Sequence, residues 1–327
     1  MDVVDRCFTE MLDVYGPNVG TAPFADWQRQ RKIVAAPFNE NTNKLVWTES
    51  LSQTKDMLDA WTACEGAGTL GTSKDTRTLS LDVLAATGFR RSYKFRSSAD
   101  PVLEEDKDYR DALKLVLDNA LFLMLVSPKL LALSFMPAAF NRVGKATARF
   151  RQYMMDMLNE ESSLLSKGEP GTGTLMTSFV RALAKNEQGE KGVEKDGPPP
   201  KSGLTLDEIL GNIFVINFAG HDTTANTLSF GMLLLAAFPD VQDWVAEELR
   251  EHLEDSNMEG WDYDRLFPRL KRCQAVLVSD PSPSSDDRVS VLTTTSWRHF
   301  ASILPSSRSQ SGPIKNHKPC SSATRNS

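Results

Sequence analysis

Residues 214–238 read FVINFAGHDTTANTLSFGMLLLAAF, and this stretch decides the fold. Two apolar runs flank a polar centre, which consists of His221, Asp222, Thr223, Thr224, Asn226 and Thr227 with Ala225 between them. The apolar runs are typical of a long buried helix. Polar side chains inside such a helix each need a hydrogen-bond partner or a use. The function of the helix is therefore expected to lie at its polar centre.

The helix is predicted to span residues 205–238. Thr205-Leu-Asp-Glu208 has the Ser/Thr-x-x-Glu form of a capping box, and acidic residues favour the positive end of the helix dipole. Pro239 is expected to end the helix, because proline lacks the N–H that a helix interior requires. At about 1.5 Å per residue the helix would be roughly 50 Å long, enough to cross a whole domain.

Helical periodicity extends outward from this helix over most of the chain. The segment 78–89 is compatible with a strand or a helix, and Gly88 favours a helix end. Further helices are predicted at 24–38, 43–61, 108–125, 140–165 and 239–253. The sequence therefore predicts a mainly α fold.

Two segments lack the apolar residues that a packed core requires. Residues 184–203 are charged and glycine-rich with three successive prolines, which predicts a mobile surface linker. Residues 278–327 are rich in Ser, Thr and Pro without a regular period, which predicts a disordered tail. One helical domain is thus expected over residues 1–277.

The composition excludes several classes of protein. The 327 residues are 40% hydrophobic and 24% charged with a net charge of −6, so the chain is globular and nucleic acid is not an expected partner. Four scattered cysteines without Cys-x-x-Cys spacing argue against a zinc site and a disulfide framework, and suit a reducing compartment. Without an uninterrupted run of about 18 apolar residues, no transmembrane segment is predicted.

The polar centre of the long helix has a face of small residues. By helical spacing this face contains Ile216, Ala219, Gly220, Thr223 and Thr227, and it is concave at Ala219 and Gly220. Thr223 is expected to turn its hydroxyl onto the carbonyl of Ala219 and to loosen the helix, and Gly220 would let a flat ligand lie against exposed backbone. In a purely structural alternative, Asp222 and His221 hydrogen-bond to neighbouring helices.

Two motifs resemble those of a known family. Ala219-Gly220-His221-Asp222-Thr223-Thr224 matches the Ala/Gly-Gly-x-Asp/Glu-Thr-Thr signature of the haem-thiolate monooxygenases, the cytochrome P-450 family. Trp27-Gln-Arg-Gln-Arg31 matches the family's Trp-x-x-x-Arg helix. The chain is similar to fungal members from near residue 20 to about residue 277. The resemblance implies an incomplete P-450-like helical fold, truncated at both ends, around the long central helix.

The resemblance also implies residue roles. Asp222 and Thr223 would be the catalytic acid–alcohol pair that passes protons to oxygen bound at a haem, beside Ala219, Gly220 and Thr224 on the cofactor side. Trp27 and Arg31 would hold a haem propionate, for which a guanidinium is geometrically suited. The implied partners are a small organic substrate and a reductase. The implied location is the cytoplasm or the periphery of the endoplasmic reticulum membrane, with the family's membrane anchor absent from this chain.

The chain departs from the family at the thiolate. The family supplies it as Phe-x-x-Gly-x-Arg-x-Cys-x-Gly, and the residues around Cys320 match this motif at no flanking position, so no metal ligand is assigned. The family's Glu-x-x-Arg pair is also missing, because Glu247 and Arg250 lie too early and are expected to form a solvated ion pair. The abrupt change at residue 278 suggests a changed reading frame or an unspliced intron.

These departures leave two hypotheses open. The first is a monooxygenase by descent, which inserts one oxygen atom from dioxygen into an organic substrate and is expected to be inactive in this chain because the thiolate and Glu-x-x-Arg motifs are missing. The second is a non-catalytic helical fragment or pseudoenzyme that acts, if at all, as a binding protein. An absorption spectrum of the purified chain separates the two hypotheses. A Soret band that shifts on reduction with carbon monoxide favours the first, whereas a colourless preparation that takes up no added haemin, which is the expected result, favours the second.

Overall fold

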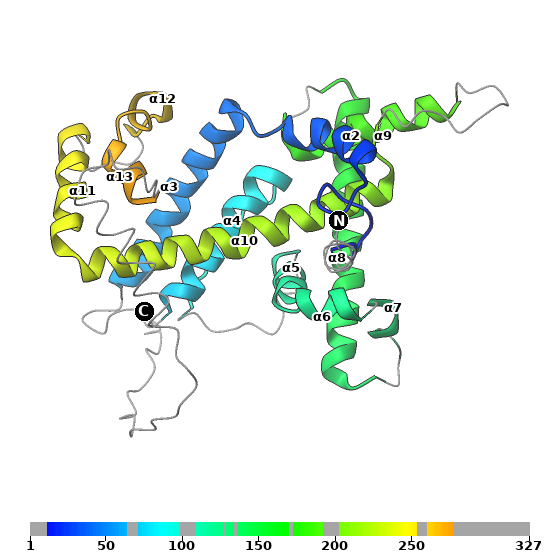
Figure 1. Cartoon of the computed structure of the whole chain (residues 1–327), viewed down its shortest axis with the longest axis horizontal. Coiled ribbons are helices and arrows are strands. Elements are labelled where there is room, and N and C mark those ends of the chain that lie inside the picture. Colours follow the sequence, from blue (N-terminus) through cyan, green and yellow to red (C-terminus); the bar gives the residue numbers. More distant parts are fainter. Residues whose placement is uncertain are drawn as a thin grey trace, which may run out of the picture. The chain divides into compact units, whose positions relative to one another are not determined.

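The computed structural model describes residues 12–63, 71–98, 109–126, 128–131, 133, 136–169, 173–191, 203–253 and 260–277. All regular elements in these ranges are helices (Figure 1). They are α2 (Phe24–Ala35), α3 (Glu40–Thr62), α4 (Thr72–Phe89), α5 (Tyr109–Asp118), α6 (Ala120–Leu125), α7 (Pro128–Leu131), α8 (Ala138–Ser166), α9 (Leu175–Lys191), α10 (Leu206–Ala237), α11 (Pro239–His252), α12 (Tyr263–Leu266) and α13 (Lys271–Leu277). The predicted mainly α fold is confirmed.

The long central helix is present as predicted. α10 begins at Leu206 and ends at Ala237, before Pro239, which opens α11. Thr205 and Glu208 form the predicted capping box: the Glu208 N–H lies 3.3 Å from Thr205 Oγ1, and the Thr205 N–H donates to Glu208 Oε2 at 2.9 Å. The box satisfies two N–H groups that the first helical turn leaves free.

One predicted helix is divided in the structure, and one ambiguous segment is resolved. The helix expected at 108–125 is divided into α5 and α6 at Asn119, whose side-chain amide donates to the Leu115 carbonyl at 2.8 Å. Asparagine readily makes such local bonds to the backbone, which compete with helix continuation. The segment 78–89 is a helix, and Arg90, in the left-handed region with φ 57°, follows its last residue.

Residues 184–191, which were expected to be part of a mobile linker, are helical instead. α9 continues to Lys191, and Asn186 in its last turns is buried. Charge and glycine content favoured a linker over these residues, because composition carries no information on the packing of α9 against α8. Residues 192–202 and the tail 278–327 lie outside the described residues.

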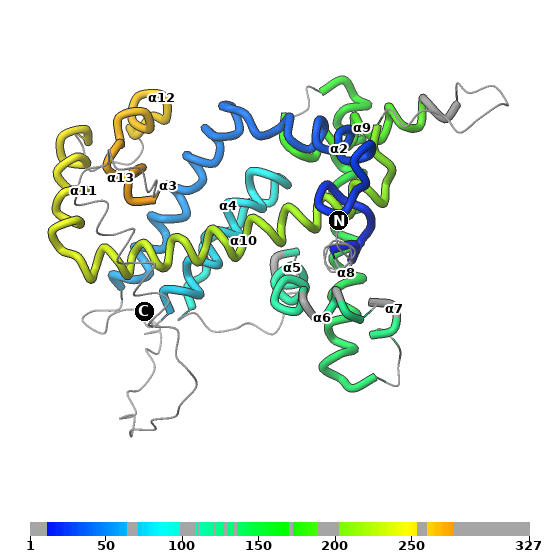
Figure 2. The backbone as a smooth tube through the Cα atoms, viewed as in Figure 1, coloured from blue at the N-terminus to red at the C-terminus, as the bar shows by residue number. Residues whose placement is uncertain are grey.

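The chain divides into two compact units. The first comprises residues 1–54, 77–95 and 101–224, and the second comprises 55–76, 96–100 and 225–327. Figure 2 follows the path of the chain through α3, α4 and α10, each of which has residues in both units.

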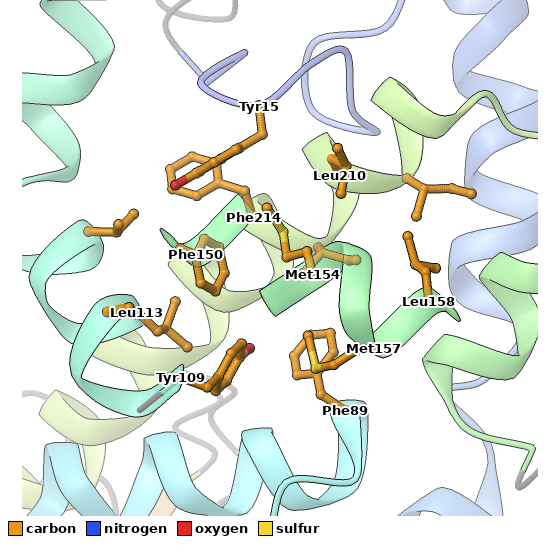
Figure 3. Close-up of a cluster of buried hydrophobic side chains, with 14 of the residues drawn as sticks. Tyr15, Phe89, Tyr109, Leu113, Phe150, Met154, Met157, Leu158, Leu210 and Phe214 are labelled. Carbon is orange, nitrogen blue, oxygen red and sulfur yellow. The ribbon is translucent and has the colours of Figure 1, made fainter. Parts of the chain in front are cut away.

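The core of the first unit is aromatic at its centre. α8 packs against α5, α7 and α9, and α2 packs against α9. Phe150 of α8 is fully buried, and its ring centre lies 5.5 Å from those of Tyr15 and Tyr109 (Figure 3). Phe214 of α10 completes the cluster, 5.4 Å from the Tyr15 ring. Burial of these large rings stabilises the unit.

The segment before α2 lies directly on the first turns of α10. Gly16, with φ 139°, approaches so closely that an added Cβ would lie 2.4 Å from the Asp207 carbonyl oxygen. A Cβ on Gly211 would meet the Gly16 carbonyl at 2.1 Å. Only glycine allows this contact at both positions. The contact is reinforced by the Val19 N–H, which donates to Asn212 Oδ1 at 3.0 Å.

In the second unit, α11 packs against α13. Glu248 of α11 is buried and accepts the N–H groups of Arg272 and Cys273, at 2.7 and 3.1 Å, so it caps the first turn of α13. Burial, together with Glu248, raises the pKa of the Cys273 thiol to about 11. Glu247 pairs with Arg272 at 3.0 Å, which differs from the expected pair with Arg250 because α13 brings a cation within reach.

Candidate functional site

The polar centre of α10 lies in a continuous helix. Residues 219–224 keep α-helical hydrogen bonding, so the expected loosening of the helix is not seen as an interruption. Its residues face different surroundings. His221 and Ala225 are buried, whereas Ala219, Thr223 and Thr224 are exposed. Ala219, Thr223 and Thr224 therefore form an exposed strip of small and hydroxyl side chains, which begins just after the largely buried residues 208–217.

Thr223 makes the hydrogen bond that the sequence predicts. Its Oγ1 donates to the Ala219 carbonyl oxygen at 2.6 Å. The carbonyl has two lone pairs, so it accepts this bond without giving up its helical partner. The hydroxyl hydrogen is thereby directed along the helix.

Gly220 is placed differently from the expectation of exposed backbone. An added Cβ would lie 3.4 Å from a methyl group of Leu84, so this glycine faces α4. Ser80 of α4 donates to the carbonyl oxygen of His221 at 3.1 Å, with the Gly220 carbonyl at 3.4 Å. Gly220 lets α4 approach α10 closely, and the surface open to a ligand is on the side of Ala219 and Thr223.

Asp222 lies among charged and titratable groups. Its Oδ1 is 3.2 Å from Nε of Arg77 on α4, and the aspartate and arginine side chains are 44% and 41% exposed. Neither atom has a hydrogen-bond partner, so the pair is held by charge without a fixed hydrogen bond. Asp222 thus has a cationic neighbour and an open path to solvent.

His221 points away from the Thr223 side, as expected. Its side chain is 4% exposed, and Nδ1 lies 3.4 Å from Asp222 Oδ1 without a hydrogen bond. Burial lowers the pKa of His221 below its ordinary value, and the Asp222 carboxylate only partly opposes this. The imidazole is therefore neutral at physiological pH, and the ion pair of Asp222 is with Arg77.

Trp27 and Arg31 lie together on α2. The Arg31 guanidinium stands 5.2 Å from the centre of the Trp27 ring, a cation–π contact between residues one turn apart. Arg31 is exposed, and it forms no ion pair within the described part of the chain. Arg29, two residues earlier, is by contrast committed to Asp26 and Glu208. Only the second arginine of the motif is therefore available to an external anion.

The structure brings the sequence-predicted residues together in two groups. Trp27 and Arg31 form one group on α2, and Asp222 and Thr223 are adjacent on α10 within the same unit. The sequence analysis missed Arg77 and Ser80. Both lie on α4, some 140 residues before α10, and no local pattern relates them to α10.

Comparison with known proteins decides the family. The family model for cytochrome P450 matches residues 13–266, which include α2, α10 and most of the helices between and after them. The chain belongs to the cytochrome P450 family. Fungal P450 monooxygenases are among its relatives, as the sequence predicted.

Two fungal relatives show the extent of the match. The chain is 26% identical over 284 residues to a cytochrome P450 monooxygenase of Arthrobotrys oligospora, which covers 83% of this chain and 48% of the relative. It is 28% identical over 263 residues to a cytochrome P450 monooxygenase of Penicillium rubens, with 77% and 43% covered. The chain thus spans about half the length of the curated P450 relatives it matches.

Solved structures agree on the fold. The cytochrome P450DA haem domain superposes with a TM-score of 0.61 over 84% of this chain and 54% of that chain, at 19% sequence identity. A second cytochrome P450 gives a TM-score of 0.60 over 83% of this chain. Within the described residues, no helix is both long and apolar enough to cross a bilayer.

Proposed function

We propose that residues 219–224 of α10 form the proton-delivery segment of a haem-dependent P450 monooxygenase site that acts on a small organic substrate with electrons from a reductase. The observation that carries this proposal is the exposed Thr223 hydroxyl, oriented by Ala219, beside the Asp222–Arg77 ion pair. The fungal relatives described as P450 monooxygenases support it.

The residues present fit a haem on two counts. Arg31 is an exposed cation without an ion-pair partner in the described chain, backed by the Trp27 ring, which suits a propionate carboxylate. Ala219 and Thr223 present a small-residue strip on α10 that leaves room for a flat ring. Haem, when bound, would supply the redox chemistry with dioxygen.

The protein's own contribution is the movement of protons. The Thr223 hydroxyl donates to the Ala219 carbonyl, and a hydroxyl group both donates and accepts hydrogen bonds, so it is suited to pass a proton along a chain of hydrogen bonds. Asp222 is next in the chain and 44% exposed, so its carboxylate exchanges protons with solvent. Nε of Arg77 lies 3.2 Å from Asp222 Oδ1 and no hydrogen bond fixes the pair, so the Asp222 side chain is able to change its partner.

A chimeric enzyme tests the proton-delivery role. The segment corresponding to residues 206–237 in the Penicillium rubens relative is replaced by that of this chain. We expect the chimera to couple electron use to product formation, and Thr223→Ala in the chimera to release peroxide instead, with at least a several-fold loss of coupling. Peroxide release per electron consumed is the measurement.

Thr227→Ala provides the matched control, because Thr227 is an exposed threonine one turn later on the same helix. Coupling in this variant is expected to equal that of the unmodified chimera. Unchanged coupling in the Thr223→Ala chimera would remove the proposed role.

We further propose that the 327-residue chain by itself does not hold haem through a thiolate, because its sequence has no Phe-x-x-Gly-x-Arg-x-Cys-x-Gly motif. Purified chain mixed with haemin, reduced and exposed to carbon monoxide is expected to give no thiolate-type absorption band. A thiolate-type band that persists after gel filtration would contradict this part of the proposal.

A further inference from the structure

A pocket in the first unit lies at the C-terminal end of α4, where α8 and α9 pass it. Its volume is about 260 Å³, the space of roughly nine water molecules at about 30 Å³ each. Its apolar lining includes Phe89, Met157, Leu164 and Met176. Phe89 and Met157 are drawn at the edge of the aromatic core in Figure 3. Methionine side chains adapt to ligands of different shape, so this lining suits a small aliphatic body.

The polar lining contains a buried carboxylate. The Glu161 side chain is 4% exposed, and its Oε1 accepts the Thr177 hydroxyl at 2.5 Å. Oε2 accepts no hydrogen bond from the described residues, and Nη1 of Arg90 lies 3.6 Å away. A carboxylate so deeply buried is costly unless its oxygens are paired. Glu161 therefore has one oxygen that is hydrogen-bonded and one that faces Arg90 at ion-pair distance without a hydrogen bond.

The two arginines of the pocket differ in how closely they pair with a glutamate. Arg91 is hydrogen-bonded to Glu160: its Nη2 donates to Glu160 Oε2 at 2.9 Å. The Arg90 side chain is 47% exposed, and its Nη1 lies 3.6 Å from Glu161 Oε2 without a hydrogen bond. Its backbone has the left-handed φ of 57°, which non-glycine residues adopt infrequently. The open pair of Arg90 and Glu161 is thus the part of the pocket that can receive a ligand.

The charges select the kind of ligand. A simple cation would compete with Arg90 for Glu161, and a simple anion would compete with Glu161 for Arg90. A zwitterion meets both groups at once and leaves the buried site neutral, with an ammonium on the glutamate and a carboxylate on the arginine. We propose that this pocket binds a small zwitterion with an apolar body, of the chemical class of a free aliphatic α-amino acid.

Titration of the full chain with L-leucine, followed by calorimetry or by NMR, tests the proposal. Saturable binding is expected in the millimolar range or tighter, as suits so small a ligand. Glu161→Gln keeps an acceptor for Thr177 and removes the charge, so we expect it to weaken binding at least tenfold. Arg90→Gln is expected to have a similar effect.

Glu160→Gln is the matched control, because Glu160 is the neighbouring glutamate, 63% exposed and already paired with Arg91. Its affinity for leucine is expected to stay within twofold of the unsubstituted chain. Two truncated probes, 4-methylpentanoate without the ammonium and 3-methylbutylamine without the carboxylate, are each expected to bind at least tenfold more weakly than leucine. These probes need no substitution, so they decide the question even if a variant fails to fold.

The proposal is overturned by any of three results. These are the absence of leucine binding up to roughly 10 mM, unchanged affinity in a folded Glu161→Gln chain, or equal binding of leucine and either truncated probe. None of these measurements depends on haem, so failure here leaves the proposed monooxygenase site untouched.

Discussion

At the scale of single residues, the polar centre of α10 is organised by what each side chain contacts. Thr223 bonds to its own helix, Asp222 pairs with Arg77, and His221 is buried against α4 and α10 without a partner for Nδ1. One turn of helix thus holds an exposed hydroxyl, a half-exposed carboxylate and a buried base. Of these residues His221 has the perturbed pKa, which burial lowers below its ordinary value.

His221 predicts a pH dependence of stability. Because burial lowers the pKa of His221 in the folded chain, the unfolded chain binds the proton more readily. Stability is therefore complete above the ordinary histidine pKa of 6.5 and is lost as the pH falls below it, by at most about 1.4 kcal/mol per pH unit. Urea denaturation of the unsubstituted chain and of His221→Gln at pH 7.5 and 5.5 measures the contribution.

The His221→Gln chain is expected to lose less stability between these two pH values than the unsubstituted chain. His252→Gln, at a histidine near the end of α11, is the control and should retain the full loss. An equal loss in the His221→Gln and unsubstituted chains would show that this imidazole does not resist protonation in the folded state.

At the scale of elements, α2 is fastened to the start of α10 by one network. Glu208 accepts from Arg29 at 2.6 and 3.0 Å and from the Thr205 N–H, while Arg29 also bonds to Asp26. Gln30 of α2 accepts from Asn212 of α10 at 2.8 Å. The helix that carries Trp27 is thereby fixed to α10.

The network predicts unequal losses of stability. Glu208→Ala leaves the Arg29 charge, 12% exposed, without its main partner, and about 3 kcal/mol of unfolding free energy should be lost. Thr205→Ala removes only the cap and should cost about 1 kcal/mol. Urea denaturation at neutral pH is the measurement.

The double variant Arg29→Met with Glu208→Leu separates the charge from the packing. Replacing both members of a buried pair by apolar side chains is often nearly neutral, so this variant should be more stable than Glu208→Ala alone. If it is equally unstable, the loss in Glu208→Ala comes from packing or capping and the buried charge has little effect.

At the scale of the whole molecule, the aromatic cluster around Phe150 holds the first unit together. It joins the segment before α2 to α5, α8 and α10 through Tyr15, Tyr109 and Phe214 (Figure 3). These elements are far apart in the sequence, so the cluster is where their mutual arrangement is specified. Deleting its central ring should therefore affect the entire unit.

Phe150→Ala is expected to lower the free energy of unfolding by about 3–5 kcal/mol, because it removes a fully buried ring and leaves a cavity. Phe140→Ala lies on the same helix but is 38% exposed, and it should cost less than about 2 kcal/mol. Thermal and urea denaturation compare the two variants. Similar losses would mean that the first unit does not depend on a single central cluster.

The existence and type of most helices could be predicted from the sequence, because helical periodicity, the capping box at Thr205 and Pro239 are local signals. The division at Asn119 and the extension of α9 to Lys191 could not. Each depends on a competition between local bonding and packing that the pattern of side chains does not resolve.

The candidate site was also predictable only where local signals determine it. The motif and the direction of the Thr223 hydroxyl were accessible from spacing alone, since a threonine bonds to a carbonyl one turn back. The role of Gly220 was not, because the neighbour that it admits, Leu84, is about 136 residues away.

By itself, the sequence determined a mainly helical chain, a long central helix with a polar midpoint and the family to which they belong. Only the tertiary structure decided which side of that midpoint is open, that Arg77 stands beside Asp222, and that Arg31 remains available while Arg29 is bound by Glu208. The physical reason is the sequence separation over which each kind of interaction acts. Helix formation and capping depend on residues within a turn or two, whereas burial and ion pairing depend on residues that only folding brings together.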